Sequence, residues 1–103
     1  MLRKCWSQVA AGAFHTCTIA GRGHVLKCFG WDELGAVSIP TNLVNVKTLV
    51  VSAGRYHSCA ISASNLELSC WGGNRYEQTS PLPQDVIAWL AVSAGGYHTC
   101  AIT

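Results

Sequence analysis

The fold of this chain is decided by the stretch Val51-Ser-Ala-Gly-Arg-Tyr-His-Ser-Cys-Ala-Ile61, because this stretch occurs three times. The first copy is Val9-Ala-Ala-Gly-Ala-Phe-His-Thr-Cys-Thr-Ile19 and the third is Val92-Ser-Ala-Gly-Gly-Tyr-His-Thr-Cys-Ala-Ile102. The copies agree in Val, Ala, Gly, His, Cys and Ile, share one aromatic position, and start 42 and then 41 residues apart. A repeat of this length indicates stacked units that bury their faces against one another.

The composition is unusually poor in charged residues for a soluble domain. Of the 103 residues, 50% are hydrophobic and only 12% are charged, whereas about 25% are charged in ordinary soluble domains. We therefore expect further repeats or a partner to cover part of the surface. The net charge of +2, without a basic run, argues against a nucleic-acid partner. No apolar stretch approaches the roughly 20 residues that cross a bilayer, so no membrane span is predicted.

The six cysteines form a repeated pattern. Cys17 and Cys28 are eleven residues apart, and so are Cys59 and Cys70, which leaves Cys5 and Cys100. Such a pattern in a small chain is typical of a disulfide framework formed in an oxidising compartment. Residues 1–8 lack the apolar core of a signal peptide. Two interpretations stay open: a part of a longer secreted protein, which we favour, or an intracellular chain with free thiols.

The cysteine spacing predicts two antiparallel hairpins. If Cys17 faces Cys28, a two-residue loop falls at Arg22-Gly23, and if Cys59 faces Cys70, a second loop falls at Ser64-Asn65. The remaining facing pairs are then Thr18–Lys27, Ile19–Leu26, Ala20–Val25, Gly21–His24, Ala60–Ser69, Ile61–Leu68, Ser62–Glu67 and Ala63–Leu66. In the second hairpin the larger apolar side chains share one face, and the smaller or polar ones share the other. The first face holds Cys59, Ile61, Leu66, Leu68 and Cys70, and the second holds Ala60, Ser62, Glu67 and Ser69.

The glycine of each copy, at positions 12, 54 and 95, is expected to serve a turn or bulge with a positive φ angle. After each hairpin come Cys-aromatic-Gly, turn residues, a proline-bearing connector and an apolar run. Each repeat therefore has about three short strands, with a possible fourth near residues 74–76. The predicted fold is all-β, built from β-propeller blades.

The second repeat resembles a known family. The segment Leu68-Ser-Cys-Trp-Gly-Gly-Asn-Arg-Tyr-Glu-Gln-Thr-Ser-Pro81, together with the His-Ser-Cys-Ala-Ile strand before it, is similar to regulator-of-chromosome-condensation repeats. That superfamily includes propeller-type β-lactamase inhibitor proteins and secreted receptor ectodomains. Glu77 stands where the family usually has Gly, and the first repeat departs from the pattern at Phe29, Asp32 and Leu34. The paired cysteines resemble the secreted or receptor branch.

The resemblance implies a propeller, usually of seven blades, of which this chain holds two complete repeats and parts of a third. The expected division is residues 9–50, 51–91 and 92–103, preceded by a short strand in residues 1–8. The segment Leu2-Arg-Lys-Cys-Trp6 is similar to the half that the last repeat lacks. We hypothesise that it complements residues 92–103 with Cys5 beside Cys100, most naturally between chains, so that a homo-oligomer completes a propeller. The alternative, which we favour, is a fragment with unpaired end cysteines.

The repeated His-x-Cys unit (His15, His57, His98) could hold a metal ion, but a structural role is favoured. Zinc needs ligands converging at about 2.0–2.3 Å, and equivalent positions on neighbouring blades lie farther apart. We expect buried histidines that hydrogen-bond the backbone of a neighbouring strand. The sequence shows no repeated acidic pair and no phosphate loop, and its cysteines are matched in pairs. No metal, cofactor or catalytic activity is predicted.

The predicted function is a non-catalytic protein-recognition or scaffold module, extracellular or in the secretory pathway, with an unknown protein partner. Its loops vary between repeats, and loops on rigid scaffolds commonly carry binding. Tryptophans that do not recur are further candidates, although core packing is the favoured role for them. The candidate contact residues are Arg22, Trp31, Asn65, Arg75 and Trp89. Two alternatives remain: an intracellular exchange-factor or ligase-adaptor propeller, and a lectin-like carbohydrate binder.

Overall fold

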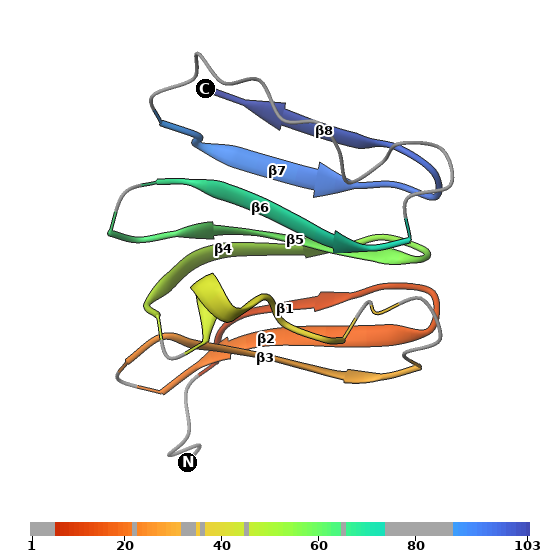
Figure 1. Ribbon diagram of the computed structural model, residues 1–103, viewed down its shortest axis with the longest axis horizontal. Helices are drawn as coiled ribbons and strands as arrows, with labels where there is room; N and C mark the ends of the chain where they lie inside the picture. The colour runs from red at the N-terminus through yellow and green to blue at the C-terminus, as the bar shows by residue number, and fades with distance from the viewer. Residues whose placement is uncertain are drawn as a thin grey trace.

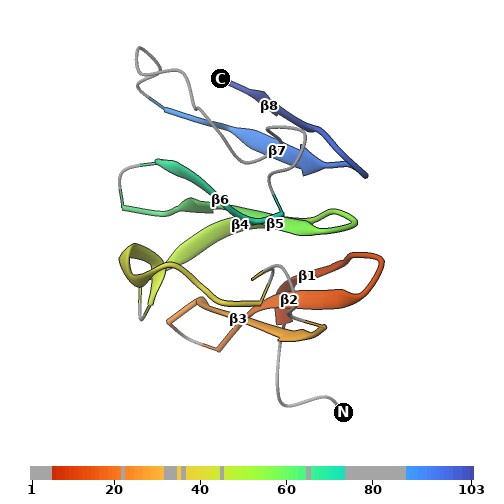
Figure 2. The ribbon, with the colours of Figure 1, turned by 45° about the vertical axis from the view of Figure 1, so that its right-hand side comes forward.

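Three small antiparallel sheets, stacked face to face, make up the fold (Figure 1). The computed structural model describes residues 6–21, 23–31, 35, 37–44, 46–64, 66–73 and 88–103. The sheets remain separate layers when the view is turned, with the N-terminal sheet at one end and the C-terminal sheet at the other (Figure 2). The all-β, propeller-blade fold is confirmed. Within the described ranges, no helix is long and apolar enough to span a membrane.

Each sheet opens with the strand that leads into the repeated motif. The first sheet contains β1 (Trp6–Ala11), β2 (His15–Ala20) and β3 (Val25–Gly30). The second contains β4 (Thr48–Ala53), β5 (His57–Ser62) and β6 (Leu68–Gly72), and the short 3-10 helix η1 (Thr41–Leu43) lies in the connection before it. The third contains β7 (Ala91–Ala94) and β8 (Thr99–Ile102). The possible fourth strand near residues 74–76 lies outside the described residues.

The predicted hairpin register is confirmed in both complete sheets. Cys17 pairs with Cys28 across β2 and β3, and Cys59 pairs with Cys70 across β5 and β6. Both pairs form disulfides. The neighbouring strand pairs also match, because the cysteine pair fixes the register of each hairpin: Thr18–Lys27, Ile19–Leu26, Ala20–Val25, Ala60–Ser69 and Ile61–Leu68. Each disulfide therefore links two neighbouring strands of one sheet.

The turn of the second hairpin is longer than predicted. The Ser62 N–H donates to the Glu67 carbonyl, as the register requires, at 3.1 Å. The Leu66 N–H donates to the Ser62 carbonyl instead of pairing with Ala63, also at 3.1 Å. Leu66 has a φ of 56°, in the left-handed region, and this bend at Leu66 takes the place of the expected Ala63–Leu66 pair. The two-residue loop predicted at Ser64-Asn65 is therefore wrong.

The core consists of the two interfaces between the sheets. The first interface joins side chains of the first and second sheets and of η1: Cys17, Ile19, Leu26, Leu43, Val51, Ala60 and Trp71. The second joins Cys59, Ile61 and Leu68 to Trp89, Val92 and Ala101. Every residue of β5 is buried, since the middle sheet is covered on both faces. Burial of one side chain such as Ile61 contributes roughly 2 kcal/mol.

Gly12 and Gly54 are needed for close packing between sheets, and the predicted reason for the three motif glycines, a positive φ angle, is wrong. The positive φ angles of glycine occur at Gly21, Gly30, Gly35 and Gly72. A Cβ atom on Gly54 would instead overlap the carbonyl oxygen of Gly95 and come within 2.7 Å of Cε1 of His57. Gly12 meets the Gly54 carbonyl and the His15 ring in the same way. Glycine is therefore required where the backbones of successive sheets touch.

Candidate functional site

The bends after β1, β4 and β7 stack at one end of the three sheets, at the right-hand edge of Figure 1. Each bend carries the aromatic residue of the repeat, so that Phe14, Tyr56 and Tyr97 form a row. The ring centroids of Phe14 and Tyr56 are 6.1 Å apart, and those of Tyr56 and Tyr97 are 5.8 Å apart. These distances allow direct aromatic contacts. The row exists because one bend is repeated at the spacing of the sheets.

Trp31 and Arg55 extend this row. The Trp31 ring lies edge-on to Phe14, with centroids 5.3 Å apart, and its backbone N–H donates to the Phe14 carbonyl at 2.9 Å. The guanidinium carbon of Arg55 lies 5.2 Å from the centroid of Tyr56 and 6.0 Å from that of Tyr97, within the range of cation–π attraction. We call these five residues the aromatic ridge: Phe14, Trp31, Arg55, Tyr56 and Tyr97.

The aromatic ridge faces solvent beside a shallow groove. Phe14, Trp31 and Tyr97 are each at least 40% exposed, and Arg55 is exposed as well. The groove has a volume of about 500 Å³ and is lined by alanines and glycines of the three bends, together with Phe14 and Arg55. The rings of the aromatic ridge thus stand above the groove, whose walls are made by small residues. A flat or extended ligand could contact both.

The motif histidines link the sheets. Nε2 of His15 lies 2.9 Å from Oγ of Ser58, and Nε2 of His57 lies 2.8 Å from Oγ1 of Thr99. In each case the hydroxyl belongs to the residue that follows the histidine of the next sheet. The expected buried structural role is thus present, and a side-chain hydroxyl of the next sheet is a partner in each case. Among the described residues, no group of three or more His, Cys, Asp or Glu side chains could hold a metal ion.

The middle histidine should make the stability of the chain depend on pH. Burial of His57, together with the neighbouring His15 and His98, lowers its pKa below the ordinary value of 6.5. The unfolded chain then binds this proton more readily than the folded protein does. The free energy of unfolding should therefore fall as pH drops below about 6.5, down to the lowered pKa of the folded state.

Urea unfolding at about pH 7.5 and about pH 5.5 measures this dependence. His57→Gln should reduce the difference in stability between the two pH values. His24→Asn, at a hairpin turn outside the histidine row, serves as the control and should leave the difference largely intact. An unchanged difference in the His57 variant would contradict the assignment.

Two of the predicted contact residues, Trp31 and Trp89, lie in the described part of the chain and are found at different places. Trp31 belongs to the aromatic ridge, whereas Trp89 packs against the core between the second and third sheets. The C-terminal ends of β2 and β5 lie at the opposite end of the sheets from the ridge (Figure 1). Arg22, Asn65 and Arg75 lie outside the described residues. Their roles in binding stay predictions.

Four residues of the aromatic ridge were not predicted as contact residues: Phe14, Arg55, Tyr56 and Tyr97. The signal was present, because an aromatic residue follows the glycine at a constant distance in all three copies. Because this aromatic residue alternates with His and Cys, the pattern alone is typical of a strand and does not indicate a bend. In the structure β2 begins at His15 and β5 at His57, so these aromatics occupy the bends before the strands.

Cys100 differs from the cysteines that form disulfides. Cys100 lies on β8 with an exposed free thiol. Cys5 lies outside the described residues, so its predicted pairing with Cys100 stays a prediction. The two disulfides that do form fit the cysteine-paired branch to which the sequence was compared.

Comparison with known proteins identifies the repeat. Residues 50–78 match the family model of the regulator of chromosome condensation (RCC1) repeat. The middle repeat is thus of the RCC1 type. The matched segment runs from β4 through β6, so it comprises the whole middle sheet. The first and third copies share its motif in register. No curated protein sequence matches the chain significantly.

Solved structures with this fold include two plant receptor ectodomains and a yeast protein. The CRINKLY WD40 ectodomain of the Arabidopsis thaliana receptor kinase ACR4 is 26% identical, with a TM-score of 0.69, over 96% of this chain and 32% of that one. The ectodomain of the Physcomitrella patens receptor kinase CR4 is 24% identical, with a TM-score of 0.72, over 95% and 27%. Prp20p from Saccharomyces cerevisiae is 17% identical, with a TM-score of 0.74, over 98% and 29%. The chain thus spans about a third of the length of these structures.

Proposed function

We propose that this chain is a non-catalytic protein-recognition module that binds its partner through the aromatic ridge. The observation that carries the proposal is the exposure of aromatic rings beside Arg55 on a stack of rigid sheets. Tyr, Trp and Arg are the residues most often found at the energetic centres of protein interfaces. A soluble domain rarely exposes such a contiguous group without a binding role.

The chemistry of the ridge indicates the kind of segment that it recognises. Arg55 presents a cation over the faces of Tyr56 and Tyr97, and a carboxylate side chain can pair with it. The exposed rings of Phe14 and Trp31 offer apolar contact area at low entropic cost. We therefore assign to the ridge a peptide segment that combines acidic and apolar side chains.

An extracellular or secretory location is part of this proposal. Two disulfides within so small a chain favour an oxidising compartment. The similar structures include the ectodomains of two receptor kinases. The intracellular exchange-factor or adaptor alternative has less support, because it is based on free thiols. The likeness to Prp20p, a protein with binding properties toward Gsp1p and histones, concerns the fold alone.

A lectin-like carbohydrate binder is the second candidate. Trp31 is exposed and does not recur in the second repeat, where Gly73 makes the corresponding backbone hydrogen bond. Exposed tryptophan rings can pack against the apolar faces of sugars. A glycan-array signal that disappears on Trp31→Ala would favour this candidate over the peptide binder.

Selection of phage-displayed random peptides on the immobilised full chain tests the proposed function. Peptides enriched on the wild type should carry Asp or Glu next to apolar residues. They should bind Arg55→Ala and Tyr97→Ala at least about tenfold more weakly, because both changes remove groups of the kind that dominate interface energies. Binding is measured by biolayer interferometry with synthetic peptides.

Leu49→Ala provides the matched control. Leu49 is an exposed apolar residue of β4 that lies away from the bends, so this variant should bind as the wild type does. Equal binding by the ridge variants would contradict the proposal. An equal loss in the Leu49 variant would also contradict it.

A further inference from the structure

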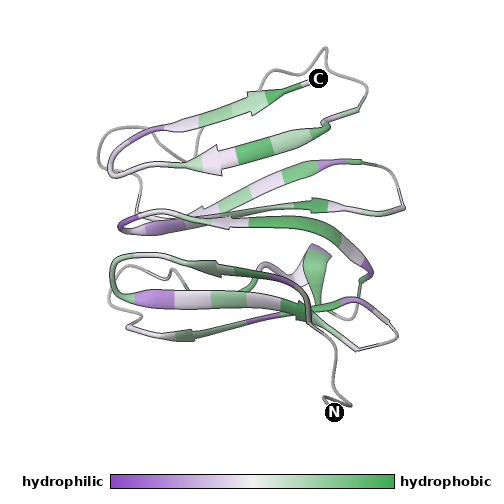
Figure 3. Ribbon diagram, turned by 180° about the vertical axis from the view of Figure 1, so that it is seen from behind, coloured by the Kyte–Doolittle hydropathy of each residue, from purple (hydrophilic) through white to green (hydrophobic). Residues whose placement is uncertain are grey.

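The two end sheets expose faces that the repeat buries everywhere else. Ile61 is fully buried against the third sheet, whereas the equivalent Ile102 on β8 is 62% exposed. Val51 is 7% exposed against the first sheet, whereas the equivalent Val9 on β1 is 66% exposed. Both end sheets carry hydrophobic stretches comparable to those of the middle sheet (Figure 3). The exposed faces are thus core surfaces without a neighbouring sheet in the described part of the chain.

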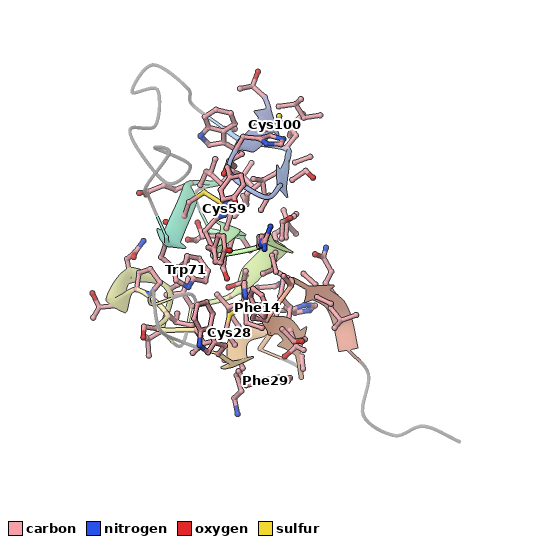
Figure 4. All side chains as sticks on the ribbon, turned by 90° about the vertical axis from the view of Figure 1, so that its right-hand side faces the viewer. Phe14, Cys28, Phe29, Cys59, Trp71 and Cys100 are labelled. Atoms are coloured by element: carbon pink, nitrogen blue, oxygen red, sulfur yellow. A yellow bond between two sulfur atoms is a disulfide. The ribbon has the colours of Figure 1, made fainter. Side chains whose placement is uncertain are left out.

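These two faces correspond to the two sides of the interface that successive sheets form within the chain. We define the N-terminal face by Val9, Thr16 and Phe29, and the C-terminal face by Ser93, Cys100 and Ile102. Figure 4 shows Phe29 at one end of the stack and Cys100 at the other, with Cys59 and Trp71 between them. The N-terminal face corresponds to the surface by which the second sheet packs on the first, since Phe29 takes the place of Trp71. The C-terminal face corresponds to the opposite surface of the second sheet, since Cys100 takes the place of Cys59.

The hydrogen bonds between sheets also repeat at equivalent positions. His15 contacts Ser58 and His57 contacts Thr99, so each histidine contacts the hydroxyl residue that follows the next histidine. His98 is exposed, and no further sheet lies beyond it in the described residues. The next hydroxyl in this series would be Thr16, which follows His15. The glycine contacts continue in the same way, because Gly95 would meet the carbonyl of another Gly12 as Gly54 meets that of Gly95.

We infer that the chain associates head to tail, with the N-terminal face of a second copy docked on the C-terminal face of the first. Ile102 then packs as Ile61 does, and His98 of one copy contacts Thr16 of the other. The occupant is a second copy because this chain carries both halves of the interface, in the register that its own sheets already use. The inference goes beyond the proposed function, since neither face includes a residue of the aromatic ridge.

A head-to-tail contact has a distinctive consequence. Unlike a two-fold symmetric dimer, it leaves one free face of each kind on every assembly, and growth stops only if a ring closes. A charge on either face should therefore prevent self-association, because each contact needs both faces. Two variants blocked on opposite faces should still form one pair.

Sedimentation of the full chain over a range of concentrations tests this inference. The wild type should show masses that are multiples of 11.0 kDa. Ile102→Lys and Val9→Lys should each be monomeric, and their mixture should form a dimer with one copy of each. Thr16→Val should weaken wild-type association roughly fivefold, the usual contribution of one hydrogen bond. Val44→Lys, which charges an exposed apolar residue outside both faces, should associate as the wild type does.

Several results would overturn the inference. A wild type that is monomeric at every concentration would show that a second copy does not cover these faces. Dimers of either single variant alone would indicate symmetric pairing through one face. Loss of association in Cys100→Ser would mean that a disulfide holds the copies together, and not the packed faces. Circular dichroism of each variant shows whether the sheets are retained, which is expected because Val9 and Ile102 are exposed in the single chain.

Discussion

Gly54→Ala is expected to destabilise the chain by about 3 kcal/mol, at the upper end of the cost of overpacking a tight interior. The added methyl group would overlap the Gly95 carbonyl and approach Cε1 of His57 to 2.7 Å. Neither neighbour can move freely, because Gly95 also accepts a hydrogen bond from the Arg55 N–H at 3.2 Å. His57 is held at 2.8 Å from Thr99. Urea unfolding followed by circular dichroism measures the change in the free energy of unfolding.

Gly96→Ala is the matched control for this prediction. Gly96 lies in the bend after β7, where a Cβ atom would have no neighbour within 4 Å. The control should change the free energy of unfolding by less than about 1 kcal/mol. If both variants were equally stable, the close contact between the backbones of successive sheets would not be a constraint on the fold.

Removal of the disulfide in the middle sheet, by Cys59→Ala with Cys70→Ala, should cost about 3 kcal/mol. In the chain-entropy model, a link between residues 11 apart restricts the unfolded chain by about this amount. Cys59 is also fully buried between the second and third sheets, so truncation of its side chain adds to the loss. The measurement is the midpoint and slope of urea unfolding, compared with those of the oxidised wild type.

Cys100→Ser is the control, because Cys100 is exposed and has a free thiol. This change should alter the free energy of unfolding of the single chain by less than about 0.5 kcal/mol, as most surface substitutions do. A double variant that unfolds at the wild-type midpoint would mean that the hairpin register alone holds β5 and β6 together. The disulfide would then contribute little to the stability of the chain.

The contacts within each sheet could be predicted from the sequence. Cys17 and Cys28, or Ile61 and Leu68, are close along the chain, so that spacing and alternation define their register. The same reasoning placed Leu68 and Ile61 on a common buried face, where they lie. It failed at Leu66, where the backbone takes a left-handed conformation without glycine. The conformation of such a turn depends on small differences in local backbone energy between alternative turns.

The contacts between sheets could not be predicted in the same way. The repeated Gly, aromatic and His positions were visible, but not what each of them touches. The partner of Gly54 is a carbonyl of the next repeat, and the partner of His15 is a hydroxyl 43 residues away. The ring of Tyr56 meets rings from three other segments. None of these distances follows from local periodicity.

The sequence by itself determined the repeat, the hairpin pairing and the two disulfides, because these depend on residues that are near one another along the chain. Only the tertiary structure decided why Gly54 must be glycine, which hydroxyl each histidine contacts, and that Phe14, Trp31, Arg55, Tyr56 and Tyr97 form one surface. The physical reason is that these features depend on the distance and offset between stacked sheets. That offset arises from the packing of both interfaces as a whole, and no single repeat contains it.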